Sequence, residues 1–496
     1  MRFTPNNNIC EPAKPITTDW KSIKWNKVNR HVTSLQRRIY RASRNNDRKK
    51  VRDLQRQLMI SNSALLIAIK RVTQVNKGKY TPGIDGFRAT SDKARGELYD
   101  KLKCLNMKHH RPKPALRKKI PKKNGKFRSL GIPTIKDRVY QEIIRMGLEP
   151  EWEAKFEPTS NGFRPSRRQH DSVRRNYYNI QSGKWNWIFE GDFKSCFDTL
   201  SHEFILEQIR DFPYYNLVKR FLEAGYVDNG AFHETHEGTP QGGLLSPLLA
   251  NIALHGMEEA LDITYKHYSN SIVTKGKYRF SRYADDFLIF AKTKEDIEKV
   301  PELLEDYLEE RGLILSEEKT KITYLSEGFN FLGFNFKRYK DGVSRIRPSK
   351  DSMNKFKQEV DYIFKSSYGH NVGVLIRRLN PLIRGTANYW RYAISGIKDL
   401  SKMDDYIWRK TLNFLKRMHP NKSWKWIKNK YFTSHSDGIH HSNWVLTDPK
   451  SGNTLDKMSW YNPRRYIMIK HDYSPYDGDK KDYFESRKHN FYFSTR

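Results

Sequence analysis

Residues 278–291, YRFSRYADDFLIFA, are the stretch that says most about the fold of this chain. The apolar residues on both sides of the Ala-Asp-Asp turn, residues 284–286, predict two strands joined by a tight turn. Adjacent carboxylates between apolar strands are unfavourable unless a cation lies on them. The only bases close in sequence are Arg279 and Arg282. The stretch therefore predicts a β-hairpin that carries a cation site at its tip.

A further carboxylate lies at the end of another predicted strand. Residues 185–193 are mostly aromatic or apolar and predict a buried strand that ends in Asp192. If this strand end meets the hairpin tip, Asp192, Asp285 and Asp286 lie together. Like charges that close need bridging cations, and oxygen ligands suit Mg²⁺. Two Mg²⁺ ions about 3.5–4 Å apart are the usual device for phosphoryl transfer. The alternative is a solvated Asp285-Asp286 turn, with Asp192 as a helix cap.

The chain is strongly basic for its size. Its 496 residues carry 92 Lys and Arg against 56 Asp and Glu, a formal net charge of +36, and its length allows about two to four domains. Such self-repulsion is tolerable when a polyanion neutralises it, so nucleic acid is the first partner to consider. The alternative is a generally basic soluble protein. With 37% apolar and 13% aromatic residues the chain is too hydrophobic for a disordered basic tail.

Membrane proteins and cysteine-rich proteins are not favoured. The longest apolar run, residues 64–69, is far shorter than the ~20 residues needed to span a bilayer. The first ten residues have no apolar stretch typical of a secretory signal. The three cysteines, Cys10, Cys104 and Cys196, form no CxxC pair, so we expect neither a disulfide framework nor a Cys-rich zinc site. A reducing, intracellular compartment fits this cysteine usage best.

Two segments concentrate the positive charge. Residues 21–60 carry 13 Lys or Arg against two Asp, and their apolar residues recur at helical spacing. They predict two helices joined near residues 44–50, with either a solvated basic face or a phosphate-binding one. Residues 108–128 carry ten Lys or Arg and no acid, and predict a hairpin whose turn is Lys123-Asn124-Gly125. Beyond about residue 345 the pattern is helical, basic and rich in Trp and Tyr.

Several motifs together resemble one family. Residues 283–286 (YADD) resemble the signature hairpin of reverse transcriptases, residues 192–198 (DFKSCFD) their first catalytic strand, and residues 238–247 (GTPQGGLLSP) the loop that holds the incoming nucleotide. They occur in family order and at family-like spacing. These motif sequences are most similar to those of the proteins encoded by group II introns, which are reverse transcriptases and maturases. Further matches are residues 81–86, 161–165, 315–320 and 384–390.

The resemblance implies an α+β right-hand polymerase: fingers and palm with an antiparallel sheet and helices, then an α-helical thumb or maturase domain, then a small C-terminal DNA-binding region. We expect a basic helical N-terminal extension over residues 1–75, fingers and palm over 76–344, thumb and maturase (X) domain over 345–435, and the DNA-binding region over 436–496. Residues 474–478 resemble the stretch that usually precedes a zinc-containing endonuclease. No CxxC pair follows it, so we expect no zinc and either a family member without the endonuclease or a truncated one.

The resemblance also assigns the catalytic roles. It implies that Asp192 and Asp285 bridge two Mg²⁺ ions, that Asp286 completes the acidic cluster, and that the main-chain carbonyl of Phe193 is another metal ligand. Neighbouring strand residues point to opposite faces, which supports unequal roles for Asp285 and Asp286. The implied reaction is attack of a primer 3′-hydroxyl on the α-phosphate of a deoxynucleotide.

The same resemblance implies a nucleotide site. Lys122 and Arg128 would grip the triphosphate, although Lys123 or Lys126 could take the role of Lys122. Gln241 would contact the nucleotide. Phe197 would lie under the sugar and exclude a 2′-hydroxyl; the alternative is an ordinary core Phe. Lys319 resembles the lysine that protonates the leaving pyrophosphate, or is a surface Lys. Residues 328–334 resemble the hairpin that grips the primer end.

Basic and aromatic residues of the two helical regions are the candidates for RNA contact, because charge and stacking together bind nucleic acid. They are Arg37, Arg38 and Arg41 in the N-terminal extension, and Arg377, Arg378, Arg384, Trp390 and Arg391 in the thumb. The alternative for any one of them is a core aromatic or a solvated charge.

The implied function is RNA-directed DNA synthesis combined with splicing. Such a protein binds its own group II intron RNA, promotes splicing, and copies the intron into target DNA from a primer strand with deoxynucleotide substrates. The alternatives are a splicing-only maturase with a fossil polymerase site and a reverse transcriptase co-opted for defence or repair. The presence of Asp192, Asp285 and Asp286 argues against the fossil site. We expect the bacterial cytoplasm, with an organelle as the alternative, and either a monomer or a dimer.

Overall fold

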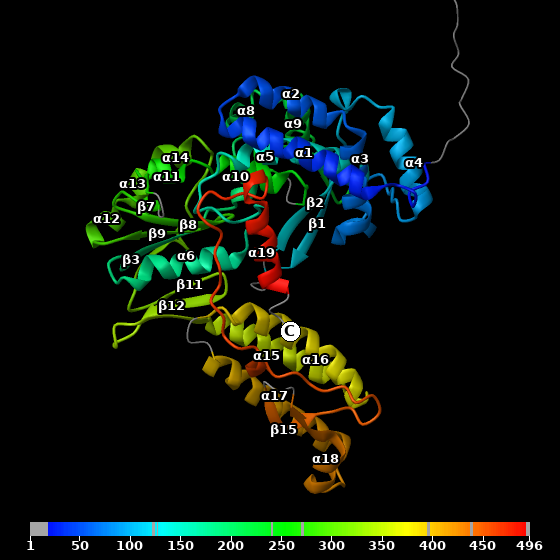
Figure 1. Cartoon of the computed structure of the whole chain (residues 1–496), viewed down its shortest axis with the longest axis vertical. Helices are drawn as coiled ribbons and strands as arrows, with labels where there is room; N and C mark the ends of the chain where they lie inside the picture. Colours follow the sequence, from blue (N-terminus) through cyan, green and yellow to red (C-terminus); the bar gives the residue numbers. More distant parts are fainter. Residues whose placement is uncertain are drawn as a thin grey trace, which may run out of the picture.

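The computed structural model describes residues 18–121, 125, 127–239, 242–268, 272–393, 397–436 and 440–492. Lys122 and Gln241, both expected in the nucleotide site, lie outside the described residues, as do Lys123 and Lys126. Helices and antiparallel sheets alternate along the chain, which confirms the expected α+β class. Figure 1 shows a broad upper body of sheets and helices, with an elongated helical part below it.

The basic N-terminal residues form two helices, as expected. These are α1 (Trp25–Arg44) and α2 (Arg48–Met59), followed by α3 (Asn62–Lys70), the π-helical turn η1 (Arg71–Val75), η2 (Lys77–Tyr80) and α4 (Asp92–Lys103). Residues of α1 at helical spacing, Val28, Val32, Leu35 and Ile39, are buried, and α1, α2 and α3 all pack on the long helix α5 (Ile135–Glu153). The apolar stripe thus goes to the core and leaves the basic faces of these helices to solvent.

The fingers region contains the predicted basic hairpin. Strands β1 (Ala115–Pro121) and β2 (Phe127–Ile132) pair antiparallel. A short hairpin, β4 (Tyr226–Asp228) and β5 (Ala231–His233), extends the same sheet because β4 pairs with β1 in parallel. The sheet order is β2-β1-β4-β5. The 3-10 turn η3 (Met107–His109) precedes it.

The palm sheet has the order β10-β3-β9-β8. Its strands are β3 (Trp187–Gly191), β8 (Arg279–Tyr283), β9 (Asp286–Ala291) and β10 (Lys321–Tyr324). Strand β9 lies between β3 and β8 and pairs antiparallel with both. The predicted strand near residues 185–193 and the predicted hairpin at 278–291 are therefore both confirmed, and they are neighbours. Helix α6 (Gln169–Gln181) packs against β8.

Short helices fill the rest of the palm. Helices α10 (Ser246–Ala253) and α11 (Met257–Ala260) are separate, because Gly256 between them adopts φ 100°. Three further short helices follow β9, and they do not merge because Pro301 has no N–H to continue the hydrogen-bond ladder: α12 (Lys294–Glu298), α13 (Val300–Leu303) and α14 (Glu305–Glu309). The other palm elements are α7 (Cys196–Thr199), α8 (His202–Gln208), α9 (Tyr215–Leu222), β6 (Tyr265–His267) and β7 (Ile272–Thr274).

A three-stranded sheet leads from the palm to the thumb. It consists of β11 (Phe329–Phe331), β12 (Phe334–Arg338) and β13 (Ser344–Pro348). The helices α15 (Lys350–Ser366), α16 (Val372–Trp390), α17 (Ile397–Met418) and α18 (Trp424–Tyr431) then form the elongated lower part of Figure 1. Their buried faces share one hydrophobic core with β11, β12 and β13. The helical pattern expected beyond residue 345 is confirmed.

The last sixty residues do not form a separate unit beside the thumb. Strands β14 (Phe432–Ser436) and β15 (His441–Leu446) pair across the boundary expected at residue 436. After η4 (Met458–Trp460) the chain leaves the thumb and runs back along the palm, through η5 (Gly478–Lys480), to α19 (Lys481–Tyr492). Figure 1 shows this red segment beside the palm, with α19 in front of the upper body.

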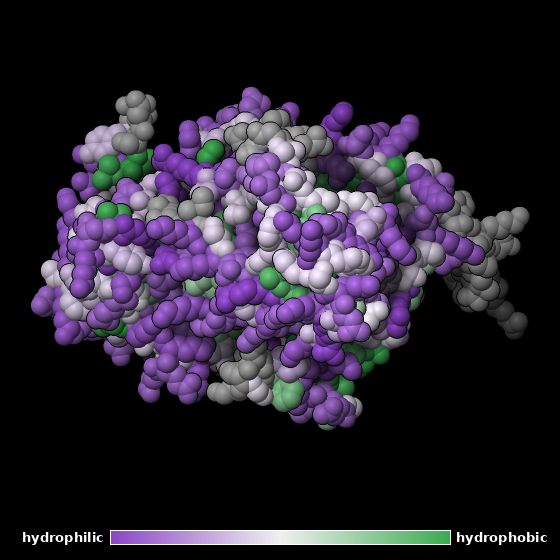
Figure 2. All heavy atoms as spheres, turned by 90° about the horizontal axis from the view of Figure 1, so that it is seen from below, coloured by the Kyte–Doolittle hydropathy of each residue, from purple (hydrophilic) through white to green (hydrophobic). Residues whose placement is uncertain are grey.

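The surface agrees with the composition. Seen from the thumb end, hydrophilic side chains cover most of the molecule, and hydrophobic ones occur in small separate patches (Figure 2). Within the described ranges no helix is both long enough and apolar enough to cross a membrane.

Candidate polymerase site

The register of the palm sheet brings the expected carboxylates to one edge. Gly191, the last residue of β3, pairs with Phe287 of β9, and Tyr283 of β8 pairs with Asp286. Asp192 therefore follows directly beside the hairpin tip that carries Asp285 and Asp286. Phe193 is buried, bridges to Leu315 and packs on the Phe287 ring at 5.0 Å between centroids. These contacts fix the end of β3 against the tip of the hairpin.

The electrostatics of this edge reflect crowded negative charge. Desolvation of the Asp286 carboxyl, together with the charges of Asp285 and Asp192, raises the pKa of Asp286 to about 6. A carboxyl with a pKa that high lacks enough positive charge around it. Carboxylate oxygens are the hard donors that Mg²⁺ prefers, so the residues present fit such an ion.

One lysine already neutralises part of this charge. The Lys319 ammonium lies 2.6 Å from Oδ2 of Asp192, and this hydrogen bond raises the pKa of Lys319. The loop that carries Lys319 is held to the strand end, because the Ser316 N–H donates to the Asp192 carbonyl at 2.8 Å. In the described part of the chain no three Asp, Glu, His or Cys side chains are arranged to hold a metal ion. The expected cluster is thus drawn partly towards Lys319.

The hairpin turn is supported from beneath by a buried arginine. Arg282 is fully buried, at 0% exposure, and its Nη1 donates to the Ala284 carbonyl at 3.1 Å and to Oδ1 of Asn251 at 3.2 Å. The Asn251 amide in turn donates to the carbonyl of Gly162 at 2.8 Å. Ala284 itself adopts φ 58°. Sequence reasoning missed this support, although an Arg inside an apolar strand and an Asn inside an apolar helix were available as signals.

Gly162 allows the turn to sit this close. A Cβ at Gly162 would lie 2.8 Å from the Cα of Ala284 and 2.9 Å from the carbonyl carbon of Tyr283. Real Cβ atoms do not approach backbone atoms this closely. Glycine is therefore required here for packing, and the segment around it packs directly against the Ala-Asp-Asp turn.

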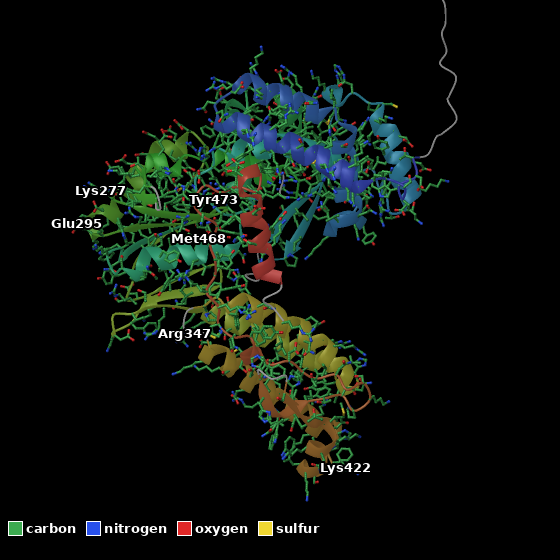
Figure 3. All side chains as sticks on the ribbon, viewed as in Figure 1. Lys277, Glu295, Arg347, Lys422, Met468 and Tyr473 are labelled. Atoms are coloured by element: carbon green, nitrogen blue, oxygen red, sulfur yellow. The ribbon has the colours of Figure 1, made fainter. Side chains whose placement is uncertain are left out.

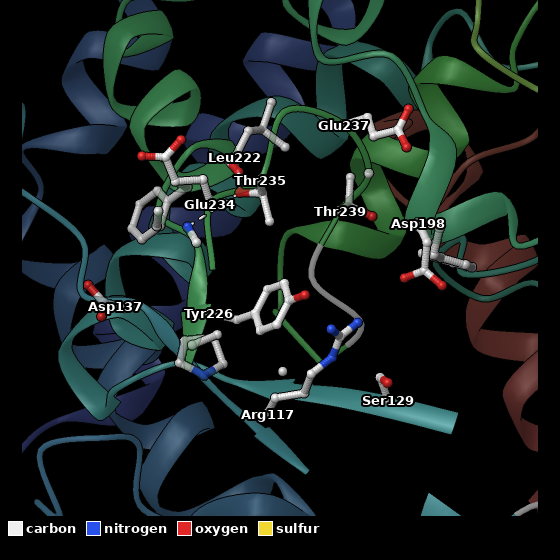
Figure 4. Close-up of a pocket in the computed structure, with 18 of the residues that line it drawn as sticks. Arg117, Ser129, Asp137, Asp198, Leu222, Tyr226, Glu234, Thr235, Glu237 and Thr239 are labelled. Atoms are coloured by element: carbon white, nitrogen blue, oxygen red, sulfur yellow. Dashed lines mark hydrogen bonds between the residues drawn. The ribbon is translucent and has the colours of Figure 1, made fainter. Parts of the chain in front are cut away.

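A cavity of about 400 Å³ lies between the two hairpins of the fingers sheet and the palm (Figure 4). Arg117 of β1 lies over the ring of Tyr226, 3.9 Å from its centroid, and Asp198 and Thr239 lie on the palm side. Phe197 lines this cavity and is 9% exposed. Its ring meets that of Phe163 edge to face at 6.3 Å. Phe197 thus borders the cavity, while most of its side chain is buried in the hydrophobic core.

Of the two residues expected to hold the triphosphate, Arg128 lies within the described residues and Lys122 does not. Arg128 is exposed on β2, where it pairs with Ile120 of β1. The Gly-rich loop is held to α5, because Oε1 of Gln141 accepts the Leu244 N–H at 3.0 Å.

Three segments of the chain match families of known proteins. Residues 120–336 match the reverse transcriptase (RNA-dependent DNA polymerase) family, residues 20–102 match the N-terminal domain of reverse transcriptase, and residues 353–432 match the maturase-specific domain of group II introns. The chain belongs to the reverse transcriptases of group II introns. The match covers the palm carboxylates, which confirms the resemblance and the right-hand polymerase fold.

Individual relatives agree with this family. The chain is 34% identical over 323 residues to Protein YkfC of Escherichia coli, covering 58% of this chain and 84% of that protein. It is 33% identical over 330 residues to Group II intron-encoded protein LtrA of Lactococcus lactis subsp. cremoris, covering 54% of each. It thus spans about half the length of that relative. Maturase-like protein 1 of Euglena gracilis is 27% identical over 391 residues, with 77% and 79% covered. A telomerase structure from Candida albicans matches with a TM-score of 0.37 and 14% identity, covering 65% of this chain and 61% of that one.

The expected RNA-contact residues of this reverse transcriptase divide into exposed and buried ones. On α1, Arg38 and Arg41 are exposed and Arg37 is half-buried. On α16, Arg377 is exposed. The two other exposed arginines there have protein partners: Arg378 donates to the Ser366 carbonyl at 2.8 Å, and Arg384 pairs with Asp456.

Trp390 and Arg391, the other two expected RNA contacts, are buried in the thumb. Trp390 is 3% exposed and packs edge to face on Phe356. Arg391 is buried and donates to the Asn462 carbonyl and to Oδ1 of Asn388. These contacts assign both side chains a packing role within the thumb, whereas Arg377 of α16 is exposed.

Proposed function

We propose that this chain copies group II intron RNA into DNA at a target site and also promotes splicing of that RNA. The observation that carries the proposal is the meeting of Asp192 with Asp285 and Asp286 at the edge of a palm sheet, within the segment that matches reverse transcriptases. The maturase-specific match over residues 353–432 supports the splicing role. Target DNA and its primer strand are the further partners of this proposal.

The proposed chemistry is attack of a primer 3′-hydroxyl on the α-phosphate of a deoxynucleotide. We assign Asp192, Asp285 and Asp286, with the carbonyl of Phe193, to hold two Mg²⁺ ions. When bound, such ions lower the pKa of the hydroxyl and neutralise charge on the leaving pyrophosphate. Lys319, whose ammonium lies 2.6 Å from Oδ2 of Asp192, is assigned to protonate the leaving pyrophosphate.

The proposal also assigns the residues that contact the nucleotide. We assign Arg128 and Lys122 to the triphosphate and Gln241 to the nucleotide. Phe197 limits the space under the sugar, since an apolar ring offers a 2′-hydroxyl no hydrogen bond. Its position on the wall of the cavity next to Asp198 supports this role.

RNA binding is proposed for the faces that keep their arginines in solvent. These are the outer side of α1, with Arg38 and Arg41, and the exposed side of α16, with Arg377. We propose the domain limits 1–75, 76–344, 345–435 and 436–496 as functional regions. Within the last region, Tyr466 and Ile469 contact Asp171 of the palm. Phosphate contacts of this kind make affinity strongly salt-dependent.

The test of the intron role is to purify the full chain with its bound RNA and sequence that RNA. We expect one dominant RNA with the features of a group II intron, and faster splicing of that RNA when the protein is added. A bound population that mirrors cellular RNA abundance, with no effect on splicing, would contradict the proposal. Arg377→Gln with Arg38→Gln should weaken retention of the RNA, while Arg409→Gln, an exposed thumb arginine paired with Asp405, serves as the matched control.

A further inference from the structure

A fully buried carboxylate lies at the start of α6, the helix that packs against β8. Asp171 is 0% exposed. Its oxygens accept the Arg168 N–H at 2.8 Å, which caps the helix, and they accept further donors from the end of the chain. These are the Tyr466 hydroxyl at 2.9 Å, the Ile469 N–H at 2.8 Å and Nη2 of Arg487 at 3.1 and 3.2 Å. A buried charge with this many donors is fully compensated only while the C-terminal segment stays in place.

We call residues 464–487 the C-terminal strap. It begins at the thumb, where the Arg464 N–H donates to the Arg391 carbonyl at 2.9 Å. It then follows the palm, where Nη2 of Arg167 donates to the His471 carbonyl at 2.9 Å and Asp472 pairs with Arg44 of α1 at 3.0 Å. Figure 3 shows Met468 and Tyr473 on this segment beside the palm. The strap therefore spans the thumb, the palm and the N-terminal helices.

His170, the residue next to Asp171, connects the start of α6 to the thumb. Nε2 of His170 lies 2.8 Å from the Tyr389 carbonyl at the end of α16. The His170 ring packs on Tyr389 and on Tyr466 of the strap, at 4.6 and 5.3 Å between centroids. Burial lowers the pKa of His170 to about 4, so the ring is neutral and packs as an uncharged group. The start of α6 is thus where palm, thumb and strap meet.

This junction reaches the turn between β11 and β12. The Tyr389 hydroxyl donates to the Leu332 carbonyl in that turn at 2.8 Å. The turn is tightly bent, with φ 49° at Leu332 and 79° at Gly333, and Phe334 after it packs on Tyr389 at 5.1 Å. Residues 328–334 are those that resemble a primer-gripping hairpin.

We propose that Asp171 is a positioning residue for the primer end: by anchoring the C-terminal strap it fixes the thumb root and the β11–β12 turn relative to the palm carboxylates. This inference rests on the proposed polymerase function. Loss of the anchor leaves the Arg487 guanidinium buried without its carboxylate and frees the strap. The orientation of the thumb relative to the palm then varies while the thumb holds the primer. The primer should dissociate more often between additions. The rate of the chemical step in an already aligned complex should change little.

The experiment compares wild type and Asp171→Asn as full chains on a DNA primer annealed to an RNA template. Extension is started together with a heparin trap, so that each product reports one binding event. We expect roughly tenfold fewer nucleotides per event in Asp171→Asn, which corresponds to about 1.4 kcal/mol in the dissociation barrier. The rate of a single addition at saturating primer and nucleotide should stay within about twofold, because the palm carboxylates are untouched. A general loss of folding would lower both quantities.

The matched control is Glu485→Gln, which breaks the exposed pair with Lys481 in the same strap. Such surface pairs contribute little, so product length should match wild type. Arg487→Met should shorten products like Asp171→Asn, and the double variant should be no worse than either single one, because the two groups act as a pair. Tyr466→Phe removes one donor to Asp171 and one acceptor for Arg487 but leaves the Asp171–Arg487 pair, so it should shorten products less.

The outcomes separate this inference from the proposed function. Hydrogen exchange of the full chain should show residues 464–487 protected in wild type and exposed in Asp171→Asn, whether or not the protein extends primers. If wild type extends primers and Asp171→Asn gives wild-type product lengths, or if the strap stays protected in the variant, the positioning role is wrong. If wild type extends no primer at all, it is the proposed function that fails.

Discussion

Replacing Gly162 by alanine tests whether the segment that packs against the catalytic turn sets the position of that turn. The added Cβ would lie 2.8 Å from the Cα of Ala284 and closer still to its nitrogen. An ordinary contact between such atoms is about 3.5 Å or more, so the turn would have to move by roughly 1 Å. Gly162 lies on a buried segment, and its carbonyl accepts a hydrogen bond from the Asn251 amide. This segment cannot shift easily, so the turn moves instead.

A shift of that size has two separate costs. Forcing an extra methyl into a packed site destabilises the fold by about 1–3 kcal/mol. Misplacing reacting groups by about 1 Å can lower a rate by roughly 10²-fold, and the moving turn carries Asp285. We therefore expect Gly162→Ala to remain folded and to add nucleotides roughly 10²-fold more slowly.

The assay is single-nucleotide extension at saturating RNA template, primer and deoxynucleotide, with thermal unfolding measured on the same sample. Gly385→Ala is the matched control. It lies within α16, and an added Cβ there meets nothing within 4 Å, so we expect a wild-type rate and a helix more stable by about 0.5–1 kcal/mol. Wild-type extension by Gly162→Ala, with its stability lowered or not, would refute the reasoning about the turn.

Three further substitutions probe the neighbouring assignments. Lys319→Met should slow single-nucleotide addition. Lys321→Met breaks the ion pair of Lys321 with Glu190, whose atoms lie 3.2 Å apart, and should leave the rate unchanged. Equal rates for the two variants would contradict the role of Lys319. Phe197→Val should raise incorporation of ribonucleotides relative to deoxynucleotides in competition assays, and unchanged selection would return Phe197 to the core. Arg377→Gln should weaken RNA affinity without lowering the melting temperature. Arg391→Gln should lower the melting temperature, because its buried guanidinium donates to the Asn462 carbonyl and to Oδ1 of Asn388; the reverse result would contradict the assignment of Arg391 to packing.

Local sequence patterns predicted the palm well. The alternation of apolar stretches around residues 284–286 predicted the hairpin, and the apolar run before Asp192 predicted its neighbouring strand. Both signals are local, because strand propensity and turn chemistry depend on residues close in sequence. The residues left the meeting of this strand end with the hairpin tip as a condition, and the register of Gly191 with Phe287 shows that the two strands pair.

Contacts between distant segments could not be predicted in this way. The anchor of Asp171 on Arg487 joins residues 316 positions apart, and nothing near either residue announces the other. For the same reason the sequence did not show that residues 466 and 469 contact Asp171 of the palm. It also did not show that Trp390 and Arg391 are buried, because composition shows which residues could bind RNA, while only tertiary packing decides which side of a helix stays in solvent.

The most direct test of the central claim is single-nucleotide extension of a DNA primer on an RNA template by wild type and Asp285→Asn, with RNA affinity measured for both. Asp285 lies at the hairpin tip beside Asp192 and Asp286, so its loss should remove the proposed metal site and leave the RNA-binding faces intact. We expect wild type to extend the primer with Mg²⁺ and the variant to be slower by at least about 10³-fold, or about 4 kcal/mol in the barrier, at unchanged RNA affinity. Extension by Asp285→Asn at the wild-type rate would contradict the assignment of this edge as the polymerase centre.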